Sequence, residues 1–301
     1  MTNRYFPAND GFKLQLYEAS APNPRATLVI AHGMAEHGKR YARFAEHLNA
    51  LQINVVVPDL RGHGETSRIN GTRGSFGTGK RNRVIVDLEE IASEVRRVHS
   101  SKHPVFLLGH SMGSMLAMRV AQRQNVKLSG LVLSAFPVHP GALVVAGKLV
   151  GNILAALFGK DTPSKFMDQL TFGKFSKGIA NRRTDFDWLS RDAAEVDAYI
   201  ADPDCGEVFT NSFFGELARL TDDAHKHLVE VDPILPVLYI AGDDDPVVGK
   251  ALGFQKNAAK MKAAIPLLET RLYAGGRHEL LNDTCRDEVI ADIAAFILKR
   301  S

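Results

Sequence analysis

Short apolar runs alternate with segments of helical periodicity along most of the chain. Residues 12–17 alternate between apolar and polar side chains, which is typical of a half-buried strand, and the Asn-Asp-Gly before them is a hairpin turn signal. Apolar runs typical of parallel strands buried on both faces follow at residues 27–31, 53–57, 105–108 and 130–134. Helical patterns follow at residues 41–51, at residues 84–99 after a long loop, and after Ser111. This order predicts an α/β fold with a mostly parallel, doubly wound sheet and right-handed crossovers.

The alternation breaks after Pro137 and resumes near Pro236. Between them lie an apolar helical stretch, a polar segment and a further helical pattern, at residues 142–158, 181–204 and 213–220, without a strand pattern. Strands then return at residues 237–241 and 269–273, with helices at residues 250–262 and 285–298. The pattern therefore predicts a core domain of residues 1–136 and 233–301 with a helical subdomain, residues 137–232, inserted in it.

The apolar stretch at residues 142–158 is nearly long enough to span a membrane. Lys148 and Asn152 interrupt it, and three glycines lower its helix propensity, so a transmembrane helix is not favoured. A helix whose apolar face lines a pocket, or makes transient contact with a lipid surface, explains the pattern better.

Composition narrows the class of protein. The 301 residues carry a formal net charge of +3, which does not indicate a nucleic-acid partner, and the basic stretch at residues 80–83 is interpreted as a solvated helix start. Cys205 and Cys285 are the two cysteines, so no disulfide framework is expected. The first residues lack the apolar segment of a signal peptide. We therefore expect a cytoplasmic protein.

The strongest chemical signal is Gly109-His110-Ser111-Met112-Gly113. A strand pattern precedes this Gly-x-Ser-x-Gly motif and a helix pattern follows it, which is the context that places a serine at the apex of a sharp turn. Glycine is needed on both sides because the strand and helix backbones approach too closely for a Cβ atom. Ser111 is therefore the candidate nucleophile.

A serine nucleophile needs a histidine base, which in turn needs a carboxylate to orient it. His278 follows the strand at residues 269–273 on a glycine-containing loop and is the candidate base. His139 precedes every suitable acid, and His225 and His227 lie in the insertion, on what we expect to be a surface helix.

The acid should come from Gly242-Asp243-Asp244-Asp245-Pro246, directly after a strand. The proline favours an extended conformation at Asp245, but spacing alone leaves Asp244 and Asp245 open. An oxyanion hole needs two further backbone N–H groups. Met112, after the serine, is expected to supply one, and Met34, in the loop after residues 27–31, the other.

Together these segments resemble the α/β-hydrolase superfamily, and within it the monoacylglycerol lipase and lysophospholipase-like group. The residues that carry the resemblance are HGMAEHGKRY at 32–41, PDLRGHGE at 58–65, GHSMG at 109–113, GDDDPV at 242–247 and RHELLN at 277–282. The resemblance implies the α/β-hydrolase fold and the insertion as a cap that forms the acyl pocket. It also assigns the acid to Asp245.

The same resemblance implies structural roles for several other residues. His63 is then a structural histidine, and Arg73, Gly74 and Phe76 belong to a structural segment. The turn at residues 202–206 resembles a cap motif of bacterial members, with Asp204 where leucine is more usual. Substrate identity depends on such cap residues, so it is the least certain part of the resemblance.

The favoured function is a serine hydrolase that cleaves carboxylic esters of single-chain lipids through an acyl-enzyme on Ser111, with a small-molecule acyl ester as the partner. An amidase, aminopeptidase or C–C hydrolase using the same triad is the alternative; an aminopeptidase could hold a substrate ammonium with Glu195, Asp197 and Asp204. A ligand receptor would not need a complete triad. Epoxide hydrolases and dehalogenases would place aspartate at position 111.

No cofactor or metal is expected. His32 and His37 lie five residues apart across a glycine loop, and no cysteine partners them in the sequence. The oligomeric state is not predicted.

Overall fold

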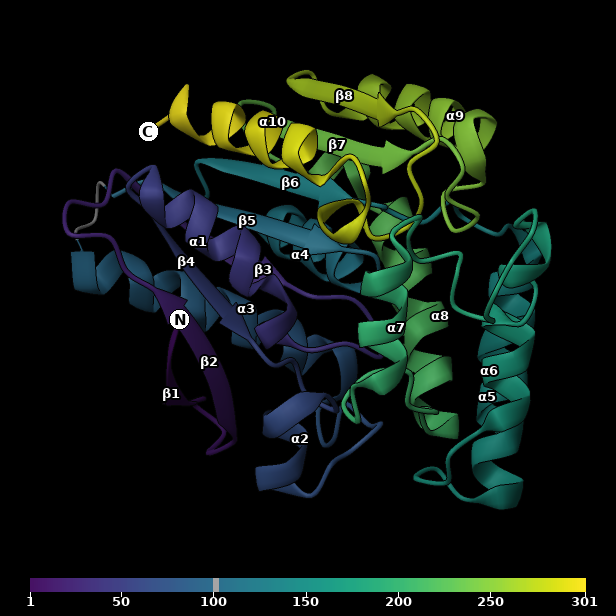
Figure 1. Ribbon diagram of the computed structural model, residues 1–301. Helices are drawn as coiled ribbons and strands as arrows, with labels where there is room; N and C mark the ends of the chain where they lie inside the picture. The colour runs from purple at the N-terminus through teal and green to yellow at the C-terminus, as the bar shows by residue number, and fades with distance from the viewer. Residues whose placement is uncertain (100–102) are drawn as a thin grey trace.

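The computed structural model describes residues 1–99 and 103–301, and within these ranges the strands form one eight-stranded sheet (Figure 1). The order across the sheet is β1-β2-β4-β3-β5-β6-β7-β8. β2 pairs antiparallel with both of its neighbours, and the remaining pairs are parallel. The strands are β1 (Thr2–Pro7), β2 (Lys13–Ala19), β3 (Ala26–Ala31), β4 (Ile53–Pro58), β5 (Val105–His110), β6 (Gly130–Ser134), β7 (Val237–Gly242) and β8 (Leu268–Tyr273).

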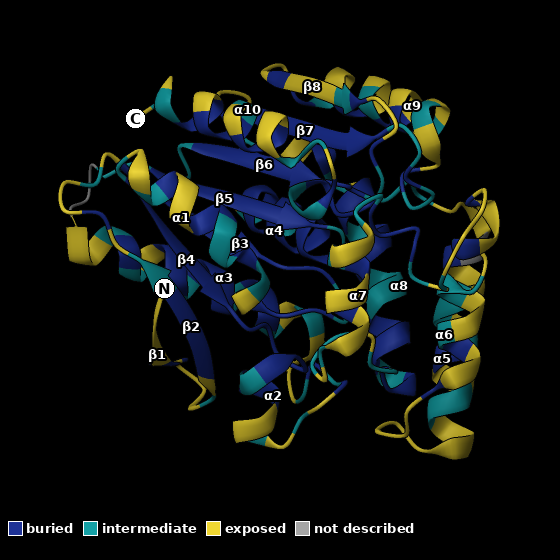
Figure 2. Cartoon of the chain, in the orientation of Figure 1, coloured by how far each residue is buried: buried dark blue, intermediate teal, exposed yellow. Residues whose placement is uncertain are grey.

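Helices cover both faces of the sheet, as the predicted doubly wound α/β arrangement requires (Figure 1). The covering helices are α1 (Ala42–Ala50) and α10 (Arg286–Leu298) on one face, and α3 (Lys80–His99), α4 (Met112–Arg123) and α9 (Lys250–Ala264) on the other. The central strands are buried along their whole length, as their continuous apolar runs predicted (Figure 2).

Between β6 and β7 the chain forms helices that lie beyond the carboxyl ends of the parallel strands (Figure 1). These are α5 (Ala142–Phe158), α6 (Lys165–Phe172), the short η2 (Ser176–Gly178), α7 (Ala193–Ala201), α8 (Asn211–Lys226) and the short η3 (Leu228–Glu230). α8 presents Phe213 and Leu220 to the main core, whereas much of the outer face of α5 and α6 is exposed (Figure 2). Among the described residues, no helix is long and apolar enough to cross a membrane.

Apart from the short η segments, four of the described elements have no counterpart in the pattern analysis: β1, α2 (Gly64–Asn70), α6 and α7. β1 buries Phe6 alone and is held by its antiparallel pairing with β2 across the predicted Asn-Asp-Gly turn. α2 lies in the predicted long loop and buries Thr66 and Ser67 rather than apolar side chains. α7 lies in the predicted polar segment, where Tyr199 is a buried member of a small cap cluster. Each element lacks an apolar period long enough to be recognised.

The interpretation of residues 80–83 as a solvated helix start is wrong for two of its arginines. Arg81 forms ion pairs with Glu216 and Asp223 of α8, each at 2.7 Å. The Arg83 side chain is only 13% exposed and pairs with Asp87 and Glu90. The start of α3 is therefore fastened by charge pairs, which a local charge count cannot reveal.

Candidate active site

Ser111 lies at the turn between β5 and α4, in the backbone conformation that the motif predicted. Its φ of 52° and ψ of −117° are strained for a residue with a side chain, and its N–H donates to the Ser134 carbonyl at 2.9 Å. A Cβ atom on Gly109 would lie 2.2 Å from the Gly113 carbonyl oxygen, and one on Gly113 would lie 2.0 Å from that of Ala31. The close approach that we inferred from these two glycines is therefore confirmed.

His278 and Asp245 form a buried pair beside this turn. His278 Nδ1 lies 2.9 Å from Asp245 Oδ2, and the two residues are 3% and 0% exposed. Burial alone would lower the pKa of His278, but the charge and hydrogen bond of Asp245 raise it above its usual value. The carboxylate therefore fixes the ring with Nε2 directed away from Asp245, as a base acting on Ser111 requires.

The three consecutive aspartates have separate partners. Asp245 Oδ1 accepts the Val247 N–H at 2.8 Å while Oδ2 faces His278. Asp244 pairs with Lys250 at 2.7 Å, and Asp243 accepts the Gly275 N–H at 2.6 Å. The structure thus brings Asp245, and not Asp244, to the histidine.

Met34 and Met112 line the same cavity as Ser111. Met112 is the first residue of α4, where backbone N–H groups have no partner within the helix. Met34 lies in the loop after β3, whose shape is held by Glu36 accepting the Gly33 N–H at 2.5 Å. Among the described residues, neither methionine N–H has an acceptor within the chain, so both can serve an oxyanion.

The other histidines have structural partners. His63 is fully buried and packs on Phe209 and Phe213. His227 is half-buried just after the end of α8 and pairs with Glu230 at 2.6 Å, so it lies near the surface but not on the helix. The expectation of a surface helix is wrong for His225, which is 3% exposed and bonds to the Pro137 carbonyl at 2.9 Å, because α8 packs directly on the core.

Arg40, whose side chain is 10% exposed, joins the loop that contains His278 to the loop that contains Met34. Arg40 contacts both Glu279 oxygens, at 2.6 and 2.7 Å, and Glu36 at 3.0 Å. Glu279 follows His278 in the chain, and Glu36 holds the Gly33 N–H. Local sequence patterns did not identify this ion triad, because Arg40 and Glu279 lie 239 residues apart.

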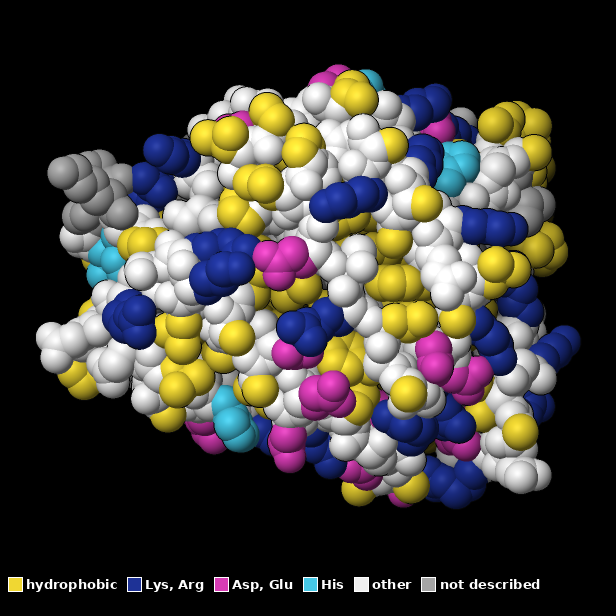
Figure 3. Space-filling model, turned by 90° about the horizontal axis from the view of Figure 1, so that it is seen from above, with side chains coloured by type: hydrophobic (Ala, Val, Ile, Leu, Met, Phe, Trp, Pro, Cys, Tyr) yellow, Lys and Arg dark blue, Asp and Glu magenta, His cyan; other side chains and the backbone are white. Residues whose placement is uncertain are grey.

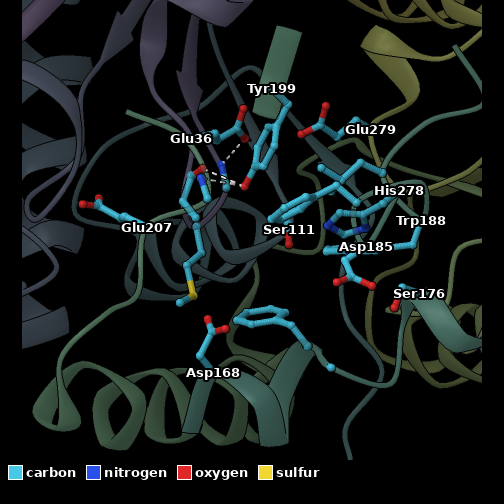
Figure 4. Close-up of a pocket in the computed structure, with 18 of the residues that line it drawn as sticks. Glu36, Ser111, Asp168, Ser176, Asp185, Trp188, Tyr199, Glu207, His278 and Glu279 are labelled. Atoms are coloured by element: carbon cyan, nitrogen blue, oxygen red, sulfur yellow. Dashed lines mark hydrogen bonds between the residues drawn. The ribbon is translucent and has the colours of Figure 1, made fainter. Parts of the chain in front are cut away.

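Two cavities meet at Ser111 and His278. One, of about 500 Å³, is lined mainly by apolar side chains, including Val144 and Val150 of α5 and Phe214 of α8. The other, of about 420 Å³, is more polar, and many of its lining residues are drawn in Figure 4. Both volumes lie within the range of about 300–1,000 Å³ that is usual for small-molecule sites.

The polar cavity contains residues that the sequence analysis missed. Trp188 packs on the His278 ring with the ring centres 5.0 Å apart. The Asp168 carboxylate points into the cavity from α6 (Figure 4). Within the described part of the chain no basic side chain pairs with Asp168, and burial raises its pKa. Neither residue belongs to a recognisable motif, so only the folded cap could reveal them.

The cap carboxylates suggested for holding a substrate ammonium do not line either cavity. Glu195 pairs with Arg43 at 2.5 Å and Asp197 with Arg183 at 2.7 Å. Asp204 pairs with Arg68. The suggestion is therefore wrong for these three residues.

The fold places Cys205 close to His37. The donor atoms of His37, Asp202 and Cys205 all lie within 4.8 Å of one another. The expectation that no cysteine partners this histidine is therefore wrong, because the turn at residues 202–206 folds back onto the loop after β3 and brings Cys205 close to His37.

Comparison with known proteins agrees with this geometry. The family model described as "Serine aminopeptidase, S33" matches residues 22–285. A monoacylglycerol lipase of Mycolicibacterium smegmatis is 28% identical over 94% of this chain and 92% of its own, and the phospholipase YtpA of Bacillus subtilis is 26% identical over 92% and 96%. These relatives confirm the resemblance to the monoacylglycerol lipase group.

The fold has close matches among solved structures. A thermostable carboxyl esterase from Bacillus coagulans, solved in complex with glycerol, superposes with a TM-score of 0.92. It covers 99% of this chain and 98% of its own at 24% identity, a likeness that establishes the fold. The chain therefore belongs to the serine aminopeptidase S33 family of the α/β-hydrolase superfamily.

Proposed function

We propose that the protein is a serine esterase that hydrolyses single-chain acyl esters of the monoacylglycerol or lysophospholipid type. The observation that carries this proposal is the meeting of an apolar and a polar cavity at Ser111 and His278. A single-chain lipid ester has the same division, with a hydrocarbon chain and a polar head on opposite sides of the scissile carbonyl.

In the proposed mechanism Ser111 attacks the ester carbonyl while His278 accepts its proton. Asp245 orients the ring and stabilises the imidazolium, and the N–H groups of Met34 and Met112 bind the oxyanion. His278 then protonates the leaving alcohol. A water molecule activated by His278 releases the fatty acid and restores Ser111.

The acyl chain is assigned to the apolar cavity. α5 supplies Val144, Gly147 and Val150 to its wall, whereas Val145 and Leu149 on the opposite side of the helix are exposed. α5 therefore contributes one apolar face to the cavity and leaves another outside.

The leaving alcohol is assigned to the polar cavity. Asp168 is suited to accept a hydrogen bond from a hydroxyl of the leaving group, because no basic side chain among residues 1–99 and 103–301 pairs with its carboxylate. Asp168→Ala should then raise KM for a monoacylglycerol more than for a p-nitrophenyl ester of the same acyl chain.

We also infer that residues 137–232 act as the cap and that its exposed apolar face makes transient contact with lipid surfaces. That face comprises Val145, Leu149, Ile153, Leu157 and Phe158 of α5 with Phe166 of α6. Figure 3 shows hydrophobic side chains gathered at this end of the molecule. The cytoplasmic location stays a prediction, which rests on the two unpaired cysteines.

Two measurements test the proposal. A fluorophosphonate probe should label the protein and fail to label Ser111→Ala; labelling that persists in the variant would show that another residue is the nucleophile. A panel of monoacylglycerols, lysophospholipids, p-nitrophenyl esters and aminoacyl-p-nitroanilides should then show the highest kcat/KM on the lipid esters. Preference for the anilides would identify an aminopeptidase, the alternative that the family description keeps open.

A further inference from the structure

A group of three different donor side chains lies between the cap and the core, outside both cavities. His37 follows the loop that contains Met34, whereas Asp202 and Cys205 lie on the turn after α7. His37 Nε2 is 2.9 Å from Asp202 Oδ2, and the Cys205 sulfur lies within 4.8 Å of one ring nitrogen of His37 and of one carboxylate oxygen of Asp202. The His37 side chain is only 6% exposed.

The donor set is chemically selective. Imidazole nitrogen, carboxylate oxygen and thiolate sulfur are the three kinds of ligand that zinc takes in proteins. Tetrahedral zinc at ordinary bond lengths separates such ligands by about 3.3–3.6 Å. The three ligand atoms therefore lie within about 1.5 Å of the spacing that tetrahedral zinc requires.

The surrounding charges favour a cation. Three carboxylates, those of Asp202, Glu36 and Glu279, act electrostatically on the Cys205 sulfur, and the positive charge of Arg40 acts in the opposite sense. Counted together, the carboxylates of Asp202, Glu36 and Glu279 outnumber the single guanidinium of Arg40, which pairs with both glutamates. Asp202 contacts the His37 ring through Oδ2 and accepts the Asp204 N–H through Oδ1.

We propose that His37, Asp202 and Cys205 form a binding site for a thiophilic divalent cation, zinc in the first place. On binding, the Cys205 thiol loses its proton to solvent as the sulfur–metal bond forms. His37 binds through Nε2 as the neutral imidazole, with its proton on Nδ1. No electron transfer and no further reactant are involved.

The bound ion would join two segments that shape the active site. The Ala35 carbonyl, next to Met34, accepts hydrogen bonds from the Gly206 N–H at 3.0 Å and the Tyr199 hydroxyl at 2.9 Å. Gly206 follows Cys205 and lines the polar cavity. A metal at this position therefore fastens the cap turn to the oxyanion loop, and this inference is independent of which ester is the substrate.

Cobalt titration of the full-length, chelator-treated protein tests the site. One equivalent of Co²⁺ should produce a sulfur-to-cobalt charge-transfer band and the visible bands of tetrahedral cobalt, and Zn²⁺ should abolish both. Cys205→Ser and His37→Gln should each lose the charge-transfer band. Cys285→Ser, the matched control at the other cysteine, should keep it.

Thermal unfolding provides the measurement that does not depend on spectra. Zn²⁺ should raise the Tm of the parent and of Cys285→Ser, because a ligand that binds only the folded state stabilises it. It should leave the Tm of Cys205→Ser unchanged. A charge-transfer band that survives in Cys205→Ser, or cobalt bound without any sulfur band, would overturn the proposal. Cobalt bound without a sulfur band would place the ion on other side chains, such as the neighbouring rings of His110 and His278.

Discussion

At the scale of single residues, the three consecutive aspartates at 243–245 have different partners, and this difference leads to a direct prediction. Asp245→Asn should lower kcat by about 10⁴-fold, because an amide cannot hold His278 in the required tautomer. Asp244→Asn is the matched control, since it removes only an exposed ion pair with Lys250 and should leave kcat near that of the parent. Steady-state measurements of kcat on a p-nitrophenyl ester test both expectations. A large loss in Asp244→Asn would mean that the loop rearranges in solution.

The raised pKa of His278 predicts the acid side of the pH profile. The base must be neutral to accept the serine proton, so kcat/KM should fall as the pH decreases through the raised pKa, with a midpoint above 6.5. In Asp245→Asn the midpoint should move below that of the parent, because burial then acts on the imidazole without the opposing carboxylate. A midpoint that does not change between the two proteins would assign the titration to another group.

The role of a residue can be predicted from the sequence where that role depends on neighbouring positions in the chain. Ser111 and its flanking glycines were predictable because the steric conflict they relieve lies within a few residues of chain. Asp245 could be separated from Asp244 only by resemblance, because both positions follow the strand and only the turn geometry distinguishes them. Asp168 could not be predicted, since its place in the cavity that Ser111 also lines depends on how the helices between β6 and β7 fold over the sheet.

At the scale of elements, the ion triad of Arg40, Glu36 and Glu279 connects the loop that contains His278 to the loop that contains Met34. Arg40→Met removes the cation shared by Glu36 and Glu279, and breaking a buried pair in this way costs about 3–5 kcal/mol. We expect a lower Tm together with a lower kcat, because both loops that flank Ser111 lose their common partner.

A conservative variant separates positioning from stability in this triad. Arg40→Lys keeps the charge but not the paired contacts to Glu279, so it should recover Tm more fully than kcat. Thermal unfolding and kcat at saturating substrate measure the two effects. If Arg40→Met loses stability while kcat in the folded fraction is unchanged, the triad serves the fold alone.

Elements were predictable wherever one hydrophobic period dominates the segment. The central parallel strands and α3, α4, α5 and α10 meet this condition. β1 and α2 do not, because the first depends on pairing with β2 and the second buries hydroxyl groups. The ion pairs of Arg81 with α8 were likewise invisible, since they join segments more than a hundred residues apart.

At the scale of the whole molecule, the cap has an apolar surface on both sides of one helix. One side of α5 lines the cavity assigned to the acyl chain, and on the other Leu149 and Leu157 are 60% and 70% exposed. A soluble cap would normally place polar side chains on that outer face. Contact with a lipid surface would cover the outer face and bring the cap close to substrates that are themselves held in lipid.

This arrangement predicts that binding to lipid and catalysis can be separated by mutation. Leu149→Gln combined with Leu157→Gln should weaken sedimentation with phosphatidylcholine vesicles by at least about tenfold, because each leucine contributes roughly 1–3 kcal/mol when it leaves water. The variant should keep its kcat/KM on a water-soluble p-nitrophenyl ester, since neither side chain lines a cavity. Leu267→Gln is the matched control, because this leucine is 46% exposed just before β8, at the opposite end of the sheet. Equal vesicle binding by all three proteins would show that the outer face of α5 does not contact lipid.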